Sequence, residues 1–484
     1  MLLHFSSDCD FLAFLEAEKY RLSLSDLNRL SSSKTFKVAL FKAKKAGIDL
    51  IRDLIAELYS DFGRPADDPA VLLRSFILKQ HFGYTSIKLW CEFVQSDPLV
   101  QYLIGSWNVP GPATHYDFMI RLTGRDPHPN EELEIPNLFK KVNRDRLKKG
   151  EKWVNFSDDD VSSLCDKYLS DPSADSDRAL YTLQALMNSL VVTPSADLGL
   201  IPDSGLKVAG DGTCLHVHAS ANGHKVDKTV TDNNTPNVRY SCIDGDWGWD
   251  SDLEKWYFGF TLFNISCHNP DLKVDLPLFL TLVKASQHDS LTAVSAIAQF
   301  MDMNPDLHPA YALFDSAMDA LPFYSFLFRN HVIPIIDQNA RSTSAQPKQL
   351  DHSGAPICEA GFSMVKFGYD KSRYRIKYRC PLALGKIDHC PNEEQCRISD
   401  YGKTAYVKTL DSPRDNLPVP YRSDRWKVIY NDRTCTERIN TRILNDYKQH
   451  STYVREGAKH AFIAIFNAIN IHMDAWYKFE AQSL

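Results

Sequence analysis

Hydrophobic residues in the first 150 positions recur at the three- and four-residue steps that place them on one face of a helix. Signals for helix starts and stops then follow at short intervals. They are Asp68-Pro69 with Gly83, Ser86, Asp97-Pro98 with Gly105, and Thr114 with Asp117 as a capping box. Leu40, Ile48, Ile51, Ile55 and Leu58 mark one earlier amphipathic helix. The pattern predicts compact helices in series, which are typical of helix-turn-helix modules and equally of any small helical bundle.

The pattern changes to short apolar runs, rich in aromatic and β-branched residues, from about residue 206. It predicts strands over 206–210, 256–265, 276–283, 310–314 and 332–336. It predicts helices from Ser290 to about 300 and over 320–328, and a last helix over about 455–478, packed on the sheet. We therefore expect an α/β fold in which a mixed sheet follows an all-helical N-terminal region.

These patterns divide the chain into five segments. They are a helical region (1–152), a polar connector with one helix near 180–190 (153–205), the first part of the sheet core (206–339), an insertion (340–425) and the rest of the core (426–484). A chain of 484 residues, 44% hydrophobic and 24% charged, is long enough for several units that each bury a core.

Charge and cysteine content narrow the class of protein. The N-terminus lacks a basic secretory signal, and Asn467 and Asn470 interrupt the most apolar run, so no membrane segment is expected. Eleven cysteines, an odd number scattered along the chain, fit a reducing compartment such as the cytoplasm. The formal net charge of −6 argues weakly against a protein that coats nucleic acid over its whole surface.

A basic run interrupts this acidic background near the end of the helical region. It includes Lys140, Lys141, Arg144 and Arg146. Such runs are usually solvated helix faces. Because the rest of the chain is net acidic, this is also the most positive local surface, and it can neutralise DNA phosphates.

Three carboxylates are candidates for one metal site. Asp211 and Asp315 each follow a predicted strand, and Glu437 lies near the start of a helix that Thr434 or Thr436 would cap. Converging carboxylates require a cation, and hard oxygen ligands select Mg²⁺ or Mn²⁺. Two such ions about 4 Å apart promote in-line displacement at phosphorus.

Other assignments of these acids are open. Asp319 and Asp337 are the nearest rivals of Asp315, although only Asp315 directly follows its apolar strand. Glu437 can instead form a structural ion pair with a neighbouring arginine.

The order Asp211, Asp315, Glu437 and the Tyr-x2-Arg-x3-Glu spacing of Tyr430, Arg433 and Glu437 resemble the DDE transposases of bacterial insertion sequences. The resemblance implies an RNase H-like core whose three acids bind two Mg²⁺ or Mn²⁺ ions. It implies that Tyr430 and Arg433 orient the scissile phosphate or the carboxylate. It further implies that the helical region binds terminal inverted repeats of double-stranded DNA and contributes to a homodimer, in the bacterial cytoplasm or at the nucleoid.

One departure concerns the helix after Glu437. Some relatives have a lysine seven residues beyond the glutamate, where this chain has Leu444. Arg442 and Lys448 are the nearest basic residues, so they are the candidates for phosphate contacts. A retired, DNA-binding regulatory protein and a related metal-dependent nuclease are the alternatives to an active transposase.

Four cysteines of the insertion form a second candidate metal site. Cys358, Cys380, Cys390 and Cys396 lie in a polar segment with few predicted strands. Four thiolates can bind structural Zn²⁺ and stabilise a segment that lacks a large core. None of the spacings is a C-x2-C, so reduced, unrelated cysteines are the alternative.

Overall fold

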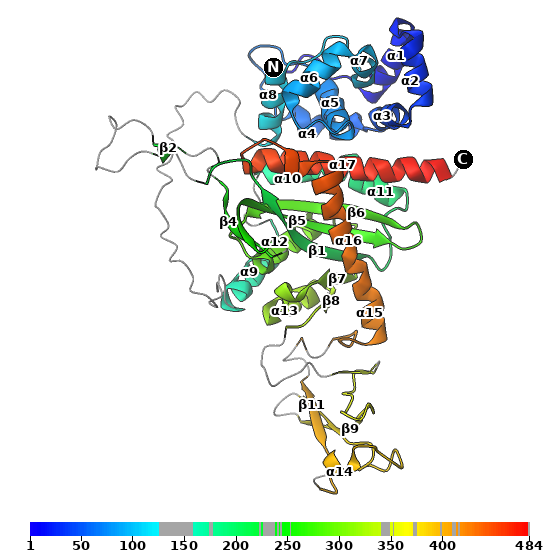
Figure 1. Ribbon diagram of the computed structural model, residues 1–484, viewed down its shortest axis with the longest axis vertical. Helices are drawn as coiled ribbons and strands as arrows, with labels where there is room; N and C mark the ends of the chain where they lie inside the picture. The colour runs from blue at the N-terminus through cyan, green and yellow to red at the C-terminus, as the bar shows by residue number, and fades with distance from the viewer. Residues whose placement is uncertain are drawn as a thin grey trace.

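The computed structural model describes residues 1–124, 158–173, 178–221, 224–225, 238–239, 242, 244–251, 253–339, 349–351, 353–370, 375–396, 399–408, 413–414 and 417–482. The protein has mixed α/β architecture: a helical N-terminal region, a central sheet with helices, and a smaller sheet at the opposite end from the helical region (Figure 1).

The N-terminal region consists of short helices. They are α1 (Asp8–Glu18), α2 (Leu24–Ser32), α3 (Lys34–Lys44), α4 (Arg52–Ala56), α5 (Pro69–His81), α6 (Ile87–Ser96), α7 (Pro98–Ile104) and α8 (Pro112–Leu122). The predicted caps of α5, α6 and α7 are confirmed, since the side chains of Asp68, Ser86 and Asp97 each accept a bond from a first-turn N–H.

Two helix predictions in this region were wrong. Gly47, with φ of 59°, interrupts the expected helix through Leu40 and Leu58, and a 3₁₀ turn (Ile48–Ile51) separates α3 from α4. Thr114 lies inside α8 rather than before it, because Gly111 is the cap and Pro112 occupies the first helical position.

A six-stranded mixed sheet forms the centre. Its strands are β1 (Lys207–His216), β4 (Asp246–Asp250), β5 (Lys255–Asn269), β6 (Val274–Lys284), β7 (Tyr311–Phe314) and β8 (Ile333–Ile336). The order is β4–β5–β1–β7–β8, and β6 also pairs with β5. β1, β7 and β8 are parallel, whereas β5 is antiparallel to its partners.

Helices cover both faces of this sheet. α12 (Asp289–Met303) lies on the face to which Gly212 of β1 points, and α16 (Cys435–Thr441) lies on the face of the neighbouring Asp211. α9 (Asp158–Ser170) packs on α12 and on α13 (Leu321–Arg329). The segment between α8 and β1 therefore carries more helix than the one predicted, with α9, α10 (Arg178–Met187) and α11 (Thr193–Asp197).

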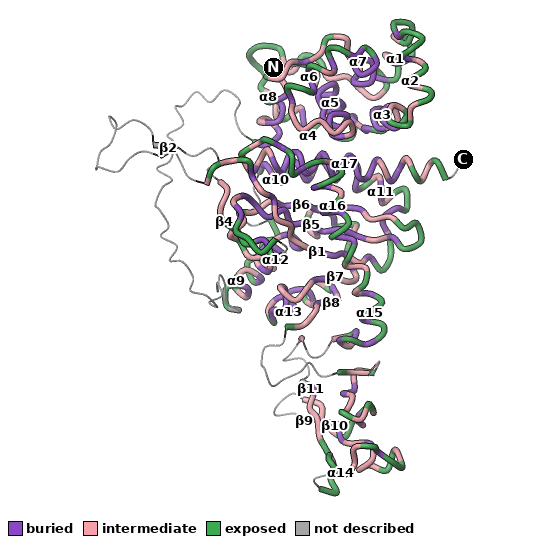
Figure 2. Tube along the Cα trace, viewed as in Figure 1, coloured by how far each residue is buried: buried purple, intermediate pink, exposed green. Residues whose placement is uncertain are grey.

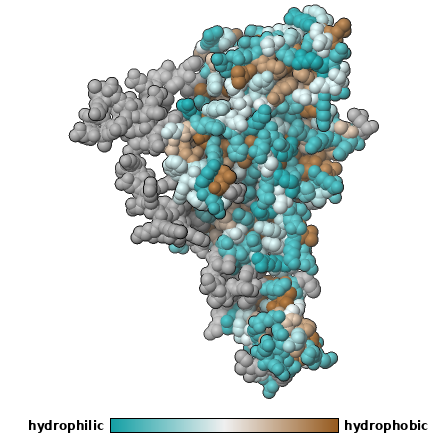
Figure 3. Space-filling view, in the orientation of Figure 1, coloured by the Kyte–Doolittle hydropathy of each residue, from teal (hydrophilic) through white to brown (hydrophobic). Residues whose placement is uncertain are grey.

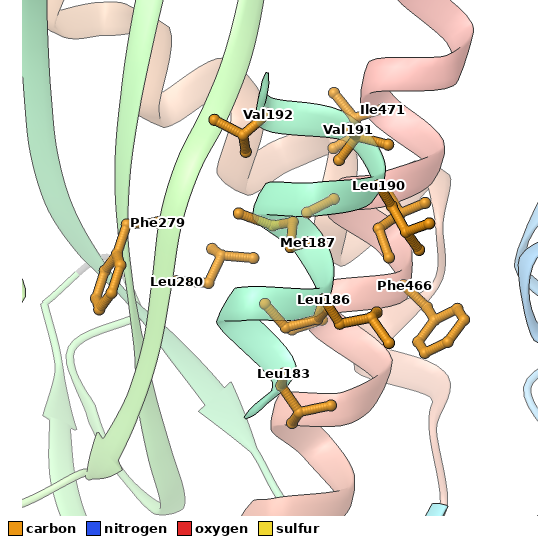
Figure 4. Close-up of a cluster of buried hydrophobic side chains, with 14 of the residues drawn as sticks. Leu183, Leu186, Met187, Leu190, Val191, Val192, Phe279, Leu280, Phe466 and Ile471 are labelled. Atoms are coloured by element: carbon orange, nitrogen blue, oxygen red, sulfur yellow. The ribbon is translucent and has the colours of Figure 1, made fainter. Parts of the chain in front are cut away.

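α17 (Gly457–Gln482) joins the sheet to the helical region, and it is buried along most of its length (Figure 2). Its apolar residues meet those of α10 and β6, as Phe466 and Ile471 show beside Leu186 and Leu190 (Figure 4). On its other side Phe76 of α5 contacts Phe462, with ring centroids 4.7 Å apart.

Polar contacts reinforce the joint between α17 and the helical region. The ammonium of Lys42, fully buried, lies 2.7 Å from a carboxylate oxygen of Asp474. The side-chain amide of Asn470 donates to the carbonyl of Ile77. A buried charge such as that of Lys42 is tolerated only when it is paired. Together with the apolar contacts, these bonds make α17 part of one buried core that includes residues of both the helical region and the sheet.

The insertion forms a small three-stranded antiparallel sheet of β9 (Val365–Asp370), β10 (Arg375–Arg379) and β11 (Thr404–Lys408), with the short α14 (Glu393–Cys396). The expectation of a strand-poor segment was therefore wrong. Among the insertion residues that the structure describes, the buried apolar cluster consists of Ala355, Met364, Tyr378 and Val407. Such a core is too small to stabilise a separate domain by hydrophobic burial alone.

The visible surface is mostly hydrophilic, with small apolar patches (Figure 3). Among the described helices, none combines the length and the apolar character required to cross a bilayer.

Candidate active site

Asp211 lies within β1, beside the point where the neighbouring strand ends. β1 pairs with β7 only from Lys207 to Ala209, whereas its pairing with β5 continues to His216. The prediction that the strand ends before Asp211 was therefore wrong. Pairing with β5 continues β1 beyond Asp211. Because the pairing with β7 has already ended there, Asp211 lies at an open edge, where a carboxylate can reach a ligand.

Asp315 directly follows β7, as predicted, and is brought to the same edge. Its carboxylate accepts a hydrogen bond of 2.9 Å from the amide of Ala317, which fixes the turn after the strand. Burial raises the pKa of Asp211 to about 7, and the negative charge of Asp315 adds to this effect. Asp315 is therefore close enough to oppose the ionisation of Asp211.

Both rivals of Asp315 have structural partners. Asp319 is completely buried, and its carboxylate forms an ion pair of 2.7 Å with Arg414. It also accepts a hydrogen bond from the hydroxyl of Tyr324. Asp337 accepts a hydrogen bond of 2.6 Å from the hydroxyl of Tyr421. These contacts favour Asp315 over its two rivals as the candidate metal ligand at this strand end.

Glu437 lies in the middle of an almost continuous helical run rather than at a capped start. α15 (Asp424–Tyr430), the 3₁₀ turn η5 (Asn431–Thr434), α16 and the π-helical turn η6 (Arg442–Asp446) follow one another directly. The expectation of a capping side chain was wrong, because neither Thr434 nor Thr436 bonds a backbone N–H as a cap. α16 is instead held to the sheet by a hydrogen bond between Asn264 of β5 and Asn440.

The Tyr-x2-Arg-x3-Glu residues form one contact series on this helical run. Arg433 donates to the carboxylate of Glu437 at 2.7 Å, and the guanidinium lies 5.8 Å from the centre of the Tyr430 ring. Two opposing effects act on the pKa of Arg433. Burial lowers this pKa, whereas Tyr430 and the nearby carboxylates, including Asp211, raise it, and their effect is the larger. Glu437 itself is 53% exposed, so solvent reaches its carboxylate.

Tyr430 is the most enclosed member of the series. Its ring stacks on Trp426 with centroids 4.4 Å apart. Burial raises the pKa of its hydroxyl to about 12, so the phenol stays protonated at neutral pH and can donate a hydrogen bond.

The two residues expected beyond Glu437 have partners on other elements. Arg442 forms an ion pair of 2.8 Å with Asp474 of α17. Leu444, which lies between Arg442 and Lys448 in the sequence, is buried. Lys448 is exposed and its ammonium donates weakly to the carbonyl of Gly83 at 3.4 Å. Phosphate binding by Arg442 and Lys448 stays a prediction.

A fourth acid, Asp289, was missed by sequence reasoning. His288 caps α12, where Ser290 had been expected, and Asp289 lies in the first turn. Burial raises the pKa of Asp289 to about 6, and Asp315 adds to this effect. The available signal was an acid at a helix start directly after a predicted strand, which is also the ordinary preference of any helix for acids there.

These carboxylates fit a divalent cation by their chemistry. Among the described residues, Asp211 and Asp289 have no hydrogen-bond donor, and no three His, Cys, Asp or Glu side chains are already arranged around one metal position. Mg²⁺ does not require such a cage, since it usually keeps several waters and binds one or two carboxylates together with substrate phosphates.

A cavity of about 360 Å³ opens beside Asp289, on the α12 side of β1. Gly212 and Thr213 of β1 line it, together with Asp289. Trp249 and Trp256, about half exposed, stand opposite each other on β4 and β5 at its wall. The site therefore has room beside the carboxylates for a ligand larger than an ion.

The four cysteines of the insertion also gather on one cavity, of about 30 Å³, which Cys358, Cys380, Cys390 and Cys396 all line. All four are free thiols. Among the described residues these four thiols are not arranged around one metal position, so zinc binding stays a prediction. The basic run with Lys140, Lys141, Arg144 and Arg146 lies outside the described residues.

Comparison with known proteins identifies one part of the chain. No curated protein matches it. Residues 37–121, which include most of the helices from α3 to α8, match the family described as Transposase domain (DUF772). The helical region thus supports a transposase family for this chain.

Proposed function

We propose that this protein is a DDE transposase of an insertion sequence, with an RNase H-like core. The helical region would bind the terminal inverted repeats of double-stranded DNA, and a homodimer would hold the two ends together. The transposase-domain match over residues 37–121 and the mixed parallel and antiparallel sheet support this proposal.

The observation that carries the proposal is the meeting of three segments at one sheet edge. Asp211 and Asp315 lie on adjacent parallel strands, and the Arg433–Glu437 pair is close enough for both its charges to act on Asp211. Structural ion pairs seldom place a second and third carboxylate beside a buried one, because each further negative charge raises the cost of ionising the others.

Asp211, Asp315 and Glu437 would hold two Mg²⁺ or Mn²⁺ ions. When bound, such ions activate an attacking oxygen and stabilise the leaving oxygen at phosphorus. Arg433 would neutralise and orient the scissile phosphate, and Glu437 must exchange its contact with Arg433 for the cation. The protonated hydroxyl of Tyr430 would donate to a phosphate oxygen. The reaction is DNA strand cleavage followed by strand transfer.

The test uses the DNA that flanks the gene. Full-length protein is incubated with a duplex carrying the inverted repeats found there, with Mg²⁺, Mn²⁺ or EDTA. We expect cleavage and joining only with a metal ion, and retained binding without cleavage in Asp211→Asn, Asp315→Asn and Glu437→Gln. Undiminished cleavage in the three variants would refute the assignment.

The same assay separates the alternatives. Cleavage without joined products indicates a related nuclease. Specific binding with no cleavage, even in Mn²⁺, indicates a DNA-binding protein with a retired catalytic site.

A further inference from the structure

We propose that Asp289 is a fourth carboxylate of the metal site and acts from the face of the sheet opposite Glu437. This inference rests on the proposed function and adds a residue outside the Asp-Asp-Glu series. It concerns how the divalent ions are held rather than which reaction they promote.

The position of Asp289 is set by a very close approach to β1. A β-carbon built on Gly212 would lie 2.7 Å from an oxygen of the Asp289 carboxylate, and 2.9 Å from a methyl group of Thr261. Any residue other than glycine would therefore displace the carboxylate, because real β-carbons do not approach so closely. Glycine at the residue after Asp211 lets Asp289 lie directly against the strand that carries the first acid.

The start of α12 is also tied to the turn that carries Asp315. The hydroxyl of Ser290 donates to the carbonyl of Ala317, and the amide of Ala317 donates to the carboxylate of Asp315. A chain of two hydrogen bonds therefore links Asp289's neighbour to the second acid. The helix start and the strand end are positioned together.

Two further observations indicate that Asp289 faces a ligand rather than a structural partner. No hydrogen bond or ion pair to its carboxylate exists within the part of the chain that the structure describes, unlike Asp319 and Asp337. Its carboxylate also lines the 360 Å³ cavity, together with Gly212 and Ala317. An acid that lies against β1 without a donor, next to an open cavity, is suited to a hydrated cation.

The geometry gives the site two sides. Residues 211 and 212 of β1 point to opposite faces, and α16 with Glu437 covers one face while α12 with Asp289 covers the other. Asp211 points to the face of α16, and Asp315 lies in the turn that is hydrogen-bonded to the start of α12. Each of the two outer acids can thus serve a different ion, either directly or through a coordinated water.

The test measures metal binding and not only activity. Electron paramagnetic resonance of free Mn²⁺ gives the number and affinity of bound ions in full-length wild type, Asp211→Asn, Asp289→Asn, Asp289→Glu and Asp302→Asn. Asp302 is the matched control, since it lies exposed at the other end of α12. We expect Asp289→Asn to weaken one of two Mn²⁺ ions by about tenfold or more, and Asp289→Glu to restore part of the loss.

The melting temperature without metal checks the fold, and it should be no lower in Asp289→Asn than in wild type. Mn²⁺ binding in Asp289→Asn equal to wild type overturns the inference. If binding depends on Asp211 but not on Asp289, only this inference fails. If wild type binds no Mn²⁺ with or without DNA, the proposed function fails with it.

Discussion

The acid cluster and the cysteine cavity each have four potential metal ligands, but the acids come from distant parts of the chain and the cysteines from one insertion, and the two groups are held by different scaffolds. Asp211, Asp315 and Asp289 are held by strands and helices of the main core, and Glu437 by a helix bonded to it. The cysteines lie on turns and short elements around a core of four buried apolar residues. Neither group has three ligands already arranged around one point in the described chain.

The lack of three ligands arranged around one point has a different meaning at each site. A magnesium site in a phosphate-handling enzyme is completed by water and by the substrate, so the protein needs to supply only part of the coordination. A structural zinc site is a closed tetrahedron of protein ligands, and nothing else completes it. Under the proposed function, the acid cluster would need only water and the DNA phosphates to complete its coordination, whereas the cysteine cavity would have to contract around an ion.

The largest expected effect tests which aspartate belongs to the cluster. Asp315→Asn should lower metal-dependent DNA cleavage by roughly 1,000-fold or more, because it removes a ligand from a metal that acts in the transition state. Its melting temperature should change little. Asp319→Asn should instead destabilise the fold by about 3 kcal/mol or more, since it leaves Arg414 without its buried partner.

Cleavage rates and thermal unfolding of the two variants check this contrast. A folded Asp319→Asn variant without activity, beside an active Asp315→Asn variant, would reverse the assignment.

The next effect concerns the arginine of the signature. Arg433→Gln should reduce cleavage by about 10- to 100-fold, since a positive charge beside the phosphate and the carboxylates is lost. Arg438→Gln is the control on the same helix, because its guanidinium bonds Asp275 of β6 at 2.6 and 2.7 Å and serves packing. Steady-state cleavage at saturating metal compares the two, and equal losses would remove the special role of Arg433.

A smaller effect comes from the pH dependence of stability. The pKa of Asp211 is raised from 3.8 to about 7 in the folded protein, so the fold binds its proton more tightly than the unfolded chain does. The stabilisation of the fold by the protonated Asp211 carboxyl is fully present below about pH 4 and is lost as the pH rises through 7. Without metal, Asp211→Asn should therefore be more stable than wild type at pH 8, by about 1–2 kcal/mol allowing for partial solvent screening, and nearer to it at pH 5.

Denaturant unfolding in EDTA at both pH values measures this difference. Addition of Mg²⁺ should stabilise wild type and not the variant. A variant less stable than wild type at pH 8 would show that the carboxylate is not strained in the fold.

The smallest effect on activity is expected at the cysteine cavity. We predict that purified full-length protein holds one Zn²⁺ per chain, and that Cys390→Ser loses it while cleavage changes by less than about threefold. Cys9→Ser, at an exposed residue of α1, is the control. Metal analysis after gel filtration decides this, and protein without zinc would mean that the four thiols are simply reduced cysteines.

Elements with strong local signals were predictable from the sequence. The caps at Asp68, Ser86 and Asp97 act over three residues, and the apolar runs of β7 and β8 need no distant partner to be recognised. Errors arose where a neighbour in space decides the outcome. β1 runs past Asp211 because β5 pairs with it there, and α16 needs no cap because α15 and η5 precede it.

The candidate site shows the same division. Asp211, Asp315 and Glu437 follow from strand ends and a motif, and their proximity could be expected because parallel strands end at one edge. Asp289 could not be chosen from the sequence, because its position depends on a contact with Gly212, which lies 77 residues earlier in the chain. Arg442 was selected by position along the helix, and the structure pairs it with an acid from α17.

The joint between α5 and α17 has a consequence for synthesis of the chain. Phe76 packs against Phe462, 386 residues further along the chain, and Lys42 has its carboxylate partner at Asp474, 432 residues further along. Translation proceeds from the N-terminus, so the helices of the matched transposase domain emerge long before the surface that covers them. These helices thus reach their final packing only when α17 has been made, and a ribosome that stops before α17 releases a chain whose helices still expose the apolar face meant for it.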